Sequence, residues 1–262
     1  MIFDGHSDIF SDVRYKREAG ETQVLKNHHL DRLRKGGIGG ACFVIWADTY
    51  NGHAPKDEME AIVKGIKGEM AETKEFVLIH NVEELKAAEA AGKFAILLGI
   101  EGLAGIGEDL SKIDELYDLG ARHAMLTWNE ENALATGVKG DPNRGLTELG
   151  KKAAKKIQEK KMILDVSHIN EKSFWDVIDL ATGPILASHS NAKALASAAR
   201  NLTDDQLRAI RDTNGLIGLN AFGDFISDNK AEQDVDHLVN HATYIADKIG
   251  VEHLGFGFDF FE

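Results

Sequence analysis

Short apolar runs alternate with segments of helical periodicity along the whole chain. Each run is apolar at consecutive positions, which is typical of parallel strands that are buried on both faces. The segments between the runs repeat apolar residues every three or four positions. Three of them begin with a helix N-cap signal, namely Asn81 followed by Glu84, Ser111 followed by Asp114, and Thr203 followed by Gln206. The predicted strands are residues 1–3, 41–47, 94–100, 123–128, 162–167, 184–188, 216–220 and 253–258.

A strand followed by a helix, repeated eight times, is the pattern of a (β/α)8 TIM barrel. The clearest helices are predicted at residues 56–74, 147–160 and 233–249. A doubly wound sheet is the competing fold, but it would usually open with a glycine-rich phosphate turn, and none follows the first strand. We therefore expect an α/β protein whose sheet closes into a barrel.

The pattern continues without a linker or a change in composition. We expect residues 1–262 to form a single (β/α)8 barrel domain. The sequence stops a few residues after the eighth predicted strand, where a barrel normally adds a covering helix. We therefore expect the domain to be truncated after strand eight.

The charge of the chain narrows the range of partners. Lys and Arg number 30 and Asp and Glu 43, a net charge of −13, which repels nucleic acids and anionic membranes. No apolar stretch is long enough for a membrane span, and the first residues lack the pattern of a secretion signal. Cys42 is the single cysteine, so no internal disulfide can form. We expect a cytoplasmic protein with no nucleic-acid or membrane partner, and a homodimer is left open.

Side chains that can bind a metal follow five of the eight predicted strands. They are His6 and Asp8 after the first strand, Glu101 after the third, His168 after the fifth, His189 after the sixth and Asp259 after the eighth. Barrel enzymes place their working residues at these strand ends. Imidazole and carboxylate ligands suit zinc, iron or manganese, and this number of ligands suits two ions that share a carboxylate.

Strand periodicity also predicts what lies beneath these ligands. Alternate side chains share a face, so Gly99 should leave the barrel interior open below Glu101, and Gly257 below Asp259. Asp4 shares the face of His6 one layer deeper, where we expect a buried hydrogen-bonding residue.

Other polar residues are expected to play no part in the chemistry. Six histidines are expected to be solvated, namely His28, His29, His53, His80, His237 and His241. Ser167 and Ser188 have outward parity, which argues against a serine nucleophile.

Five segments carry a resemblance to a known family. DGHSDI, GIEG, ILDVSH, ILASHSNAKALASAARNLTDDQL and LGFGFDF are similar, in order and spacing, to motifs of the membrane (renal) dipeptidase family. This is zinc metallopeptidase family M19 of the amidohydrolase superfamily of barrels. The resemblance extends from Asp4 to Asp259, and the SH…SH…RN block is its most specific part.

The resemblance implies a role for each matched residue. It implies that His6 and Asp8 bind a first zinc ion, that His168 and His189 bind a second, and that Glu101 bridges the two. It also implies that Arg200 holds the C-terminal carboxylate of the substrate and that Asp259 accepts a proton from the bridging hydroxide.

One departure from the family pattern concerns the end of the fourth strand. Many members have LTH there, whereas this chain has Trp128 after Leu126 and Thr127. We expect Trp128 and the following Asn129 to contact the substrate, with an altered substrate range or rate.

The function implied is a zinc-dependent dipeptidase. It would hydrolyse dipeptides with a free C-terminal carboxylate through a hydroxide that bridges two Zn²⁺ ions, and other divalent metals stay open. One alternative is a related amidohydrolase for a lactone, amide or phosphoester, although the fourth strand lacks the lysine that many such enzymes carbamylate. A second is a non-catalytic metal-binding barrel. Arg200 could also be a surface residue that pairs with Asp204 or Asp205.

Overall fold

A curved sheet of parallel strands forms the centre of the molecule in the computed structural model, which describes residues 1–47 and 52–261. The strands run in the spatial order β3-β4-β2-β1-β9-β8-β7-β6-β5. Their bounds are β1 Ile2–Ser7, β2 Ile38–Trp46, β3 Phe76–Ile79, β4 Phe94–Glu101, β5 His123–Met125, β6 Ile163–Asp165, β7 Ile185–Ala187, β8 Leu216–Leu219 and β9 Leu254–Phe256. Every pairing between these strands is parallel, as the apolar runs predict.

Backbone hydrogen bonds between β4 and the β5 region close the sheet. Arg122 N donates to Leu98 O over 2.9 Å, and Leu103 N donates to Leu126 O over 3.3 Å. The eight strands other than β3 thus surround one interior, and the predicted (β/α)8 barrel is confirmed.

β3 was not predicted from the sequence. This strand pairs with the first half of β4, with Phe76 opposite Phe94, and lies outside the ring of eight. Its four residues, Phe-Val-Leu-Ile, form an apolar run like the others, but the eightfold pattern was already complete without it. The eight predicted strands are all present, although β1 extends further, to Ser7, and β5 is shorter and ends at Met125.

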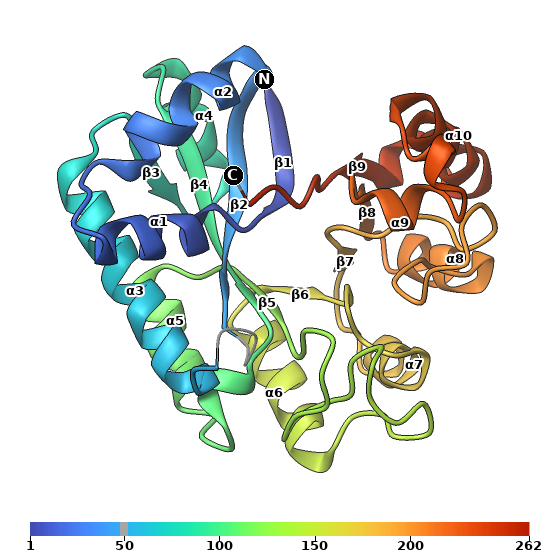
Figure 1. Cartoon of the computed structure of the whole chain (residues 1–262). Coiled ribbons are helices and arrows are strands. Elements are labelled where there is room, and N and C mark those ends of the chain that lie inside the picture. The colour runs from blue at the N-terminus through green and yellow to red at the C-terminus, as the bar shows by residue number, and fades with distance from the viewer. Residues whose placement is uncertain (48–51, 262) are drawn as a thin grey trace.

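Helices cover the outside of the barrel (Figure 1). Their bounds are α1 Ile9–Glu18, α2 Leu30–Lys35, α3 Pro55–Glu72, α4 Val82–Ala90, α5 Lys112–Leu119, α6 Glu148–Glu159, α7 Glu171–Asp179, α8 Asp204–Asp212, α9 Gly223–Ile226 and α10 Val235–Ile249. Short turns of other helix types lie at Leu25–His29, Ala104–Ile106, Lys230–Glu232 and Val251–His253. Within the described residues, no helix is long and apolar enough to cross a membrane.

Helix starts follow the capping signals in two of the three predicted cases. The Asn81 side chain accepts from Glu84 N at the start of α4, and Thr203 forms a full capping box with Gln206 at the start of α8. Ser111 does not cap α5, because its hydroxyl donates to Asp109 instead.

Two of the six histidines expected to be solvated, His29 and His241, are buried, so that expectation was wrong for them. His29 Nε2 lies 2.7 Å from Asp12 Oδ2, and this pair joins the turn Leu25–His29 to α1. His241 Nδ1 accepts from Ala192 N over 3.1 Å, while its Nε2 donates to Ile226 O over 2.8 Å. Each ring forms hydrogen bonds with a segment that is distant in the sequence. Helical periodicity does not reveal such a contact.

The last strand leads to an exposed row of aromatic rings. Phe256, Phe258 and Phe260 stack with centroids 5.2 and 5.4 Å apart, and Phe256 and Phe260 are 45% and 42% exposed. Phe260 forms a bridge with Ser7, so the end of the chain runs beside β1 (Figure 1).

Candidate metal centre

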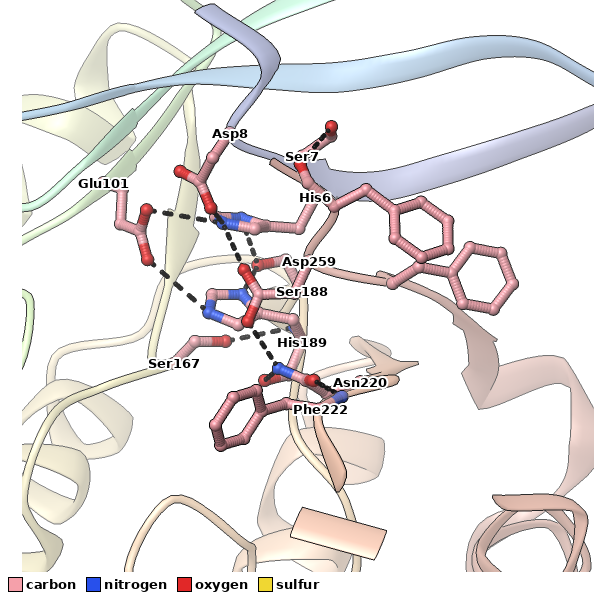
Figure 2. Close-up of polar contacts among 12 residues, drawn as sticks. His6, Ser7, Asp8, Glu101, Ser167, Ser188, His189, Asn220, Phe222 and Asp259 are labelled. Carbon is pink, nitrogen blue, oxygen red and sulfur yellow. Dashed lines mark hydrogen bonds and ion pairs between the residues drawn. The ribbon is translucent and has the colours of Figure 1, made fainter. Parts of the chain in front are cut away.

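Histidines and carboxylates meet at the carboxyl ends of the barrel strands. His6 belongs to β1 and Glu101 to β4, and Asp8 follows β1 directly. His168, His189 and Asp259 follow β6, β7 and β9 within three residues. Figure 2 shows His6, Asp8, Glu101, His189 and Asp259 pointing toward one another. All six predicted ligand and catalytic residues at the strand ends therefore gather in one place.

Glu101 lies between histidines on its two sides. Its Oε1 is 2.8 Å from His168 Nε2 and 3.7 Å from His189 Nε2. Its Oε2 is 3.4 Å from His6 Nε2. The two oxygens of this carboxylate thus face different histidines.

Two overlapping groups of potential ligand atoms surround His6. The first comprises His6, Glu101 and His189, and the second His6, Asp8 and Asp259. Within each group the ligand atoms lie within 4.8 Å of one another. His6 Nε2 is 3.9 Å from Asp8 Oδ2 and 3.7 Å from Asp259 Oδ1.

Hydrogen bonds orient the rings so that their Nε2 atoms point inward. His168 Nδ1 lies 2.9 Å from the acceptor Asn129 Oδ1, and His189 Nδ1 lies 2.8 Å from Ser188 Oγ. With both rings protonated on Nδ1, as binding of a metal through Nε2 requires, their Nε2 lone pairs face each other across 2.7 Å. Two facing lone pairs repel, and a cation bound beside them would remove the repulsion.

Burial disfavours the charged forms of two carboxylic acids and two histidines in this centre. Burial raises the pKa of Glu101 to about 8, with a smaller contribution from the neighbouring Asp259. It also raises the pKa of Asp8, with Glu101 adding to the rise, and lowers the pKa values of His168 and His189. A divalent cation would favour the ionised carboxylates and the neutral imidazoles alike.

Unpaired atoms in the centre agree with a metal site. His6 Nε2 and Asp8 Oδ1 are buried without a hydrogen-bond partner, a costly arrangement for a site that binds nothing. Nitrogen and oxygen donors of this kind are the usual ligands of zinc and related ions. The residues present therefore fit a divalent metal centre.

Two of these residues have backbone conformations that side chains rarely adopt. His168 has φ +70° and Asp259 has φ +67°. Each follows a strand, and the left-handed turn redirects its side chain toward the centre. Strain of this kind is concentrated at functional sites.

Sequence reasoning missed two residues that hold the centre in place. Asn220 Nδ2 donates to Asp259 Oδ2 over 2.9 Å. Ser188, which was expected to point outward, contacts His189 and also lies 3.5 Å from His6 Nδ1 through its Oγ. Asn220 lies at the end of a predicted strand, as the predicted ligands do. That position is the feature of the sequence that could have identified it as a site residue.

An open cleft of about 620 Å³ leads to the centre. The indoles of Trp46 and Trp128 form part of its wall, with ring centroids 5.3 Å apart. Trp128 also lies 5.9 Å from the ring of His168. Asn129 lines the same cleft while its side chain holds His168. Trp128 and Asn129 are thus within reach of a molecule bound in the cleft.

Arg200 lines the cleft and is only 6% exposed. Its guanidinium donates to His189 O over 3.1 Å and to Ser190 Oγ over 3.4 Å, and its Nε has no partner. Burial lowers the pKa of Arg200 to about 10, so the side chain remains a cation at neutral pH. Within the described residues no carboxylate forms an ion pair with it, whereas a buried cation normally has a partner.

The surface alternative for Arg200 is wrong. Asp204 forms an ion pair with Lys248, and Asp205 pairs with Arg208. These contacts lie on the outside of the barrel, while Arg200 faces the cleft.

Comparison with known proteins identifies the family. The family model described as membrane dipeptidase, peptidase family M19, matches residues 1–262. An uncharacterized protein of the PQQ-III 3′ region of Acinetobacter calcoaceticus is 30% identical over 95% of this chain and 90% of its own length. An uncharacterized dipeptidase from Schizosaccharomyces pombe is 28% identical over 99% of this chain and 68% of its own length.

Solved structures agree with the sequence comparison. A metallopeptidase from Rhodobacter sphaeroides, solved with a phosphinate mimic of L-Ala-D-Ala, has a TM-score of 0.89 and 26% identity over 99% of this chain and 85% of its own. A metallopeptidase described as dipeptidase AC, of family M19, has a TM-score of 0.88 and 26% identity over 98% of this chain and 84% of its own. The resemblance drawn from the strand-end motifs is confirmed, and the chain belongs to peptidase family M19, the membrane dipeptidases, a family of metal-dependent hydrolases.

Proposed function

We propose that this protein is a zinc-dependent dipeptidase that hydrolyses the peptide bond of dipeptides with a free C-terminal carboxylate. The observation that carries the proposal is Arg200, a buried cation at the wall of the cleft that pairs with no carboxylate among residues 1–47 and 52–261. A guanidinium matches the two oxygens of a carboxylate, and burial strengthens the pairing. The dipeptidases among its relatives support the same substrate class.

Two Zn²⁺ ions are proposed for the centre, one held by His6 and Asp8 and one by His168 and His189, with Glu101 bridging. Zinc bound there would supply polarisation of the scissile carbonyl and a water that can lose a proton near neutral pH. The contacts of Glu101 on both sides support the bridging role.

Residues of the chain itself bind the substrate and transfer the proton. Arg200 holds the substrate carboxylate and so fixes the position of the peptide bond. Asp259 Oδ1 is the proposed proton acceptor for the attacking water, and it later returns the proton to the leaving amine. Asn220 holds the other oxygen of Asp259, which keeps Oδ1 directed at the centre. Trp46 and Trp128 limit the access of bulk water to the bound peptide.

Hydrolysis of a dipeptide and of its C-terminal amide tests the proposal. The zinc-loaded protein should cleave a panel of L-Xaa-L-Xaa and L-Xaa-D-Xaa dipeptides, and Arg200→Ala should lower kcat/KM by about 30-fold or more. With the amidated substrates, which have no anion for Arg200 to hold, the same variant should change kcat/KM by less than about threefold.

Arg208→Ala is the matched control, because Arg208 is an arginine on α8 that pairs with Asp205 outside the cleft. It should leave both substrates unaffected. Equal losses on the acid and the amide in Arg200→Ala would show that Arg200 is structural. Failure to cleave any dipeptide when zinc is bound would overturn the proposed activity.

A further inference from the structure

A buried pair of side chains lies beneath the metal centre and belongs to none of the roles described so far. His123 Nε2 and Asp165 Oδ2 are 2.6 Å apart, and neither side chain has any exposed surface. His123 begins β5 and Asp165 ends β6, so the pair joins neighbouring strands inside the barrel.

The carboxylate of Asp165 also binds the backbone just before two metal ligands. Its Oδ1 accepts from Ser167 N over 2.7 Å, and its two oxygens lie 3.3 and 3.2 Å from Ser188 N. Ser167 precedes His168, and Ser188 precedes His189. One carboxylate therefore fixes the ends of β6 and β7 relative to each other at the point where each strand delivers a histidine.

The two serines extend this link to the histidine side chains. Ser167 Oγ accepts from His189 N over 3.3 Å. Ser188 Oγ lies 2.8 Å from His189 Nδ1 and 3.5 Å from His6 Nδ1 (Figure 2). A continuous set of hydrogen bonds thus joins Asp165 to His189 and reaches His6.

Gly99 provides the space that His123 occupies. A Cβ at Gly99 would lie 2.6 Å from His123 Nδ1 and 2.7 Å from Cys42 Sγ. The open interior predicted below Glu101 is therefore filled by an imidazole. Well-packed apolar side chains in such a place are often as stable as an ion pair, so a contribution to stability explains the pair poorly.

We propose that His123 and Asp165 are positioning residues for the metal centre: Asp165 sets the backbone that directs His168 and His189, and His123 holds Asp165 in place. The inference rests on the metal centre of the proposed function, but it concerns metal binding and needs no substrate. Second-layer partners of this kind typically change metal affinity about 10- to 100-fold when they are removed.

Metal affinity, measured by competition with a chelator, tests the proposal. His123→Phe keeps the ring and removes the donor, so it should weaken zinc binding about 10- to 100-fold. His123→Gln places an amide Nε2 near the original donor and should stay within about threefold of wild type. With cobalt in place of zinc, the visible spectrum should change in His123→Phe and stay close to wild type in His123→Gln.

A second buried histidine–aspartate pair provides the matched control. His29 and Asp12 lie 2.7 Å apart at the turn Leu25–His29, away from the metal ligands. His29→Phe should lower the Tm of the metal-free protein without changing zinc affinity or the cobalt spectrum. This comparison separates the loss of a buried pair from the loss of ligand positioning.

The outcomes distinguish the two proposals. If wild-type protein binds no divalent metal, the metal centre itself is wrong. If wild type binds zinc and His123→Phe binds it equally well with an unchanged cobalt spectrum, the pair is structural only and the inference fails. Should His123→Phe not fold, Asp165→Asn, which has one acceptor oxygen instead of two, carries the same expectation, and wild-type zinc affinity in that variant overturns the inference.

Discussion

Asp259 combines a rare backbone conformation with a hydrogen bond that fixes its side chain. Its φ of +67° is uncommon for a residue with a side chain, and Asn220 holds one of its oxygens. The other oxygen is left to face His6. A carboxylate held in this way can accept a proton repeatedly from the same position.

Replacing Asp259 with Asn should therefore separate metal binding from turnover. An amide cannot accept the proton, so kcat should fall about 10²- to 10⁴-fold. The other metal ligands stay in place, so most of the bound metal should remain. Steady-state kinetics and elemental analysis of the same preparation provide the two measurements.

Asp224→Asn is the control for this change. Asp224 lines the same cleft, and its Oδ1 accepts from Gln233 Nε2. Replacing Asp224 with Asn should leave kcat close to wild type. A wild-type kcat in Asp259→Asn would mean that the proton is taken by another group.

Site residues that lie at the end of a strand could be predicted from the sequence. Site residues whose roles depend on contacts with distant parts of the chain could not. His6 and Glu101 each end a strand, and the carboxyl ends of parallel strands meet on one side of a barrel. Asn220 and His123 act through partners 39 and 42 positions away along the chain. Nothing in their neighbouring residues identifies those partners.

At the scale of elements, the close approach of β7, β8 and β9 determines where His189 lies. A Cβ at Gly257 would be 1.7 Å from Ser188 O, and a Cβ at Gly218 would be 1.9 Å from the same atom. Glycine is thus needed at Gly218 in β8 and at Gly257 just after β9 for the backbone before His189 to lie where it does. Gly257 was expected to open the interior below Asp259, and the structure shows instead that it admits a neighbouring backbone.

Gly257→Ala should consequently destabilise the protein and disturb metal binding together. The methyl group meets backbone rather than a flexible side chain, so we expect a loss of about 1–3 kcal/mol in the free energy of unfolding. Displacement of Ser188 should also weaken zinc binding. Denaturant unfolding and chelator competition measure the two effects.

Gly183→Ala is the control for adding a methyl group, because nothing lies within 4 Å of its Cβ position. It should be neutral or stabilise the protein by up to about 1 kcal/mol. If Gly257→Ala were as stable as Gly183→Ala, the strand spacing described here would be wrong.

Element type was the most predictable level of the fold. Buried apolar runs and capped helices follow from local chemistry, so eight strands and the starts of α4 and α8 were identified. β3 has the same local character but a different place in the sheet. The local sequence therefore indicates that a segment forms a strand, but it does not indicate whether that strand belongs to the ring of eight.

At the scale of the whole molecule, the metal-free centre makes folding depend on pH. Burial raises the pKa of Glu101 to about 8, so the folded protein keeps a proton that the unfolded chain releases above pH 4.5. For His123, burial would lower the pKa, but Cys42 and Asp165 outweigh it and raise the pKa to about 9. Both groups bind more protons in the folded state, so both make the metal-free protein less stable as pH rises.

Two of the histidines proposed to bind metal oppose this trend only at lower pH. Burial lowers the pKa values of His168 and His189, so the unfolded chain binds more protons than the folded protein below about pH 6.5. The stability that these two neutral histidines contribute is fully present above that pH and is lost as the pH falls below it. Between pH 6.5 and 8 the effects of Glu101 and His123 are therefore not offset by these two rings.

The metal-free protein should lose about 2–4 kcal/mol of stability between pH 6.5 and 8, at up to about 1.4 kcal/mol per pH unit for each proton. Zinc requires ionised carboxylates and neutral imidazoles, so its affinity should increase over the same interval. The difference in Tm between zinc-loaded and chelator-treated protein should then widen from pH 6.5 to 8. Glu101→Gln removes this titrating group, so the stability of the metal-free variant should decrease less steeply with pH. A metal-free Tm that rises with pH in this window would show that Glu101 is ionised without a metal, and that the centre is less desolvated than the burial of these side chains implies.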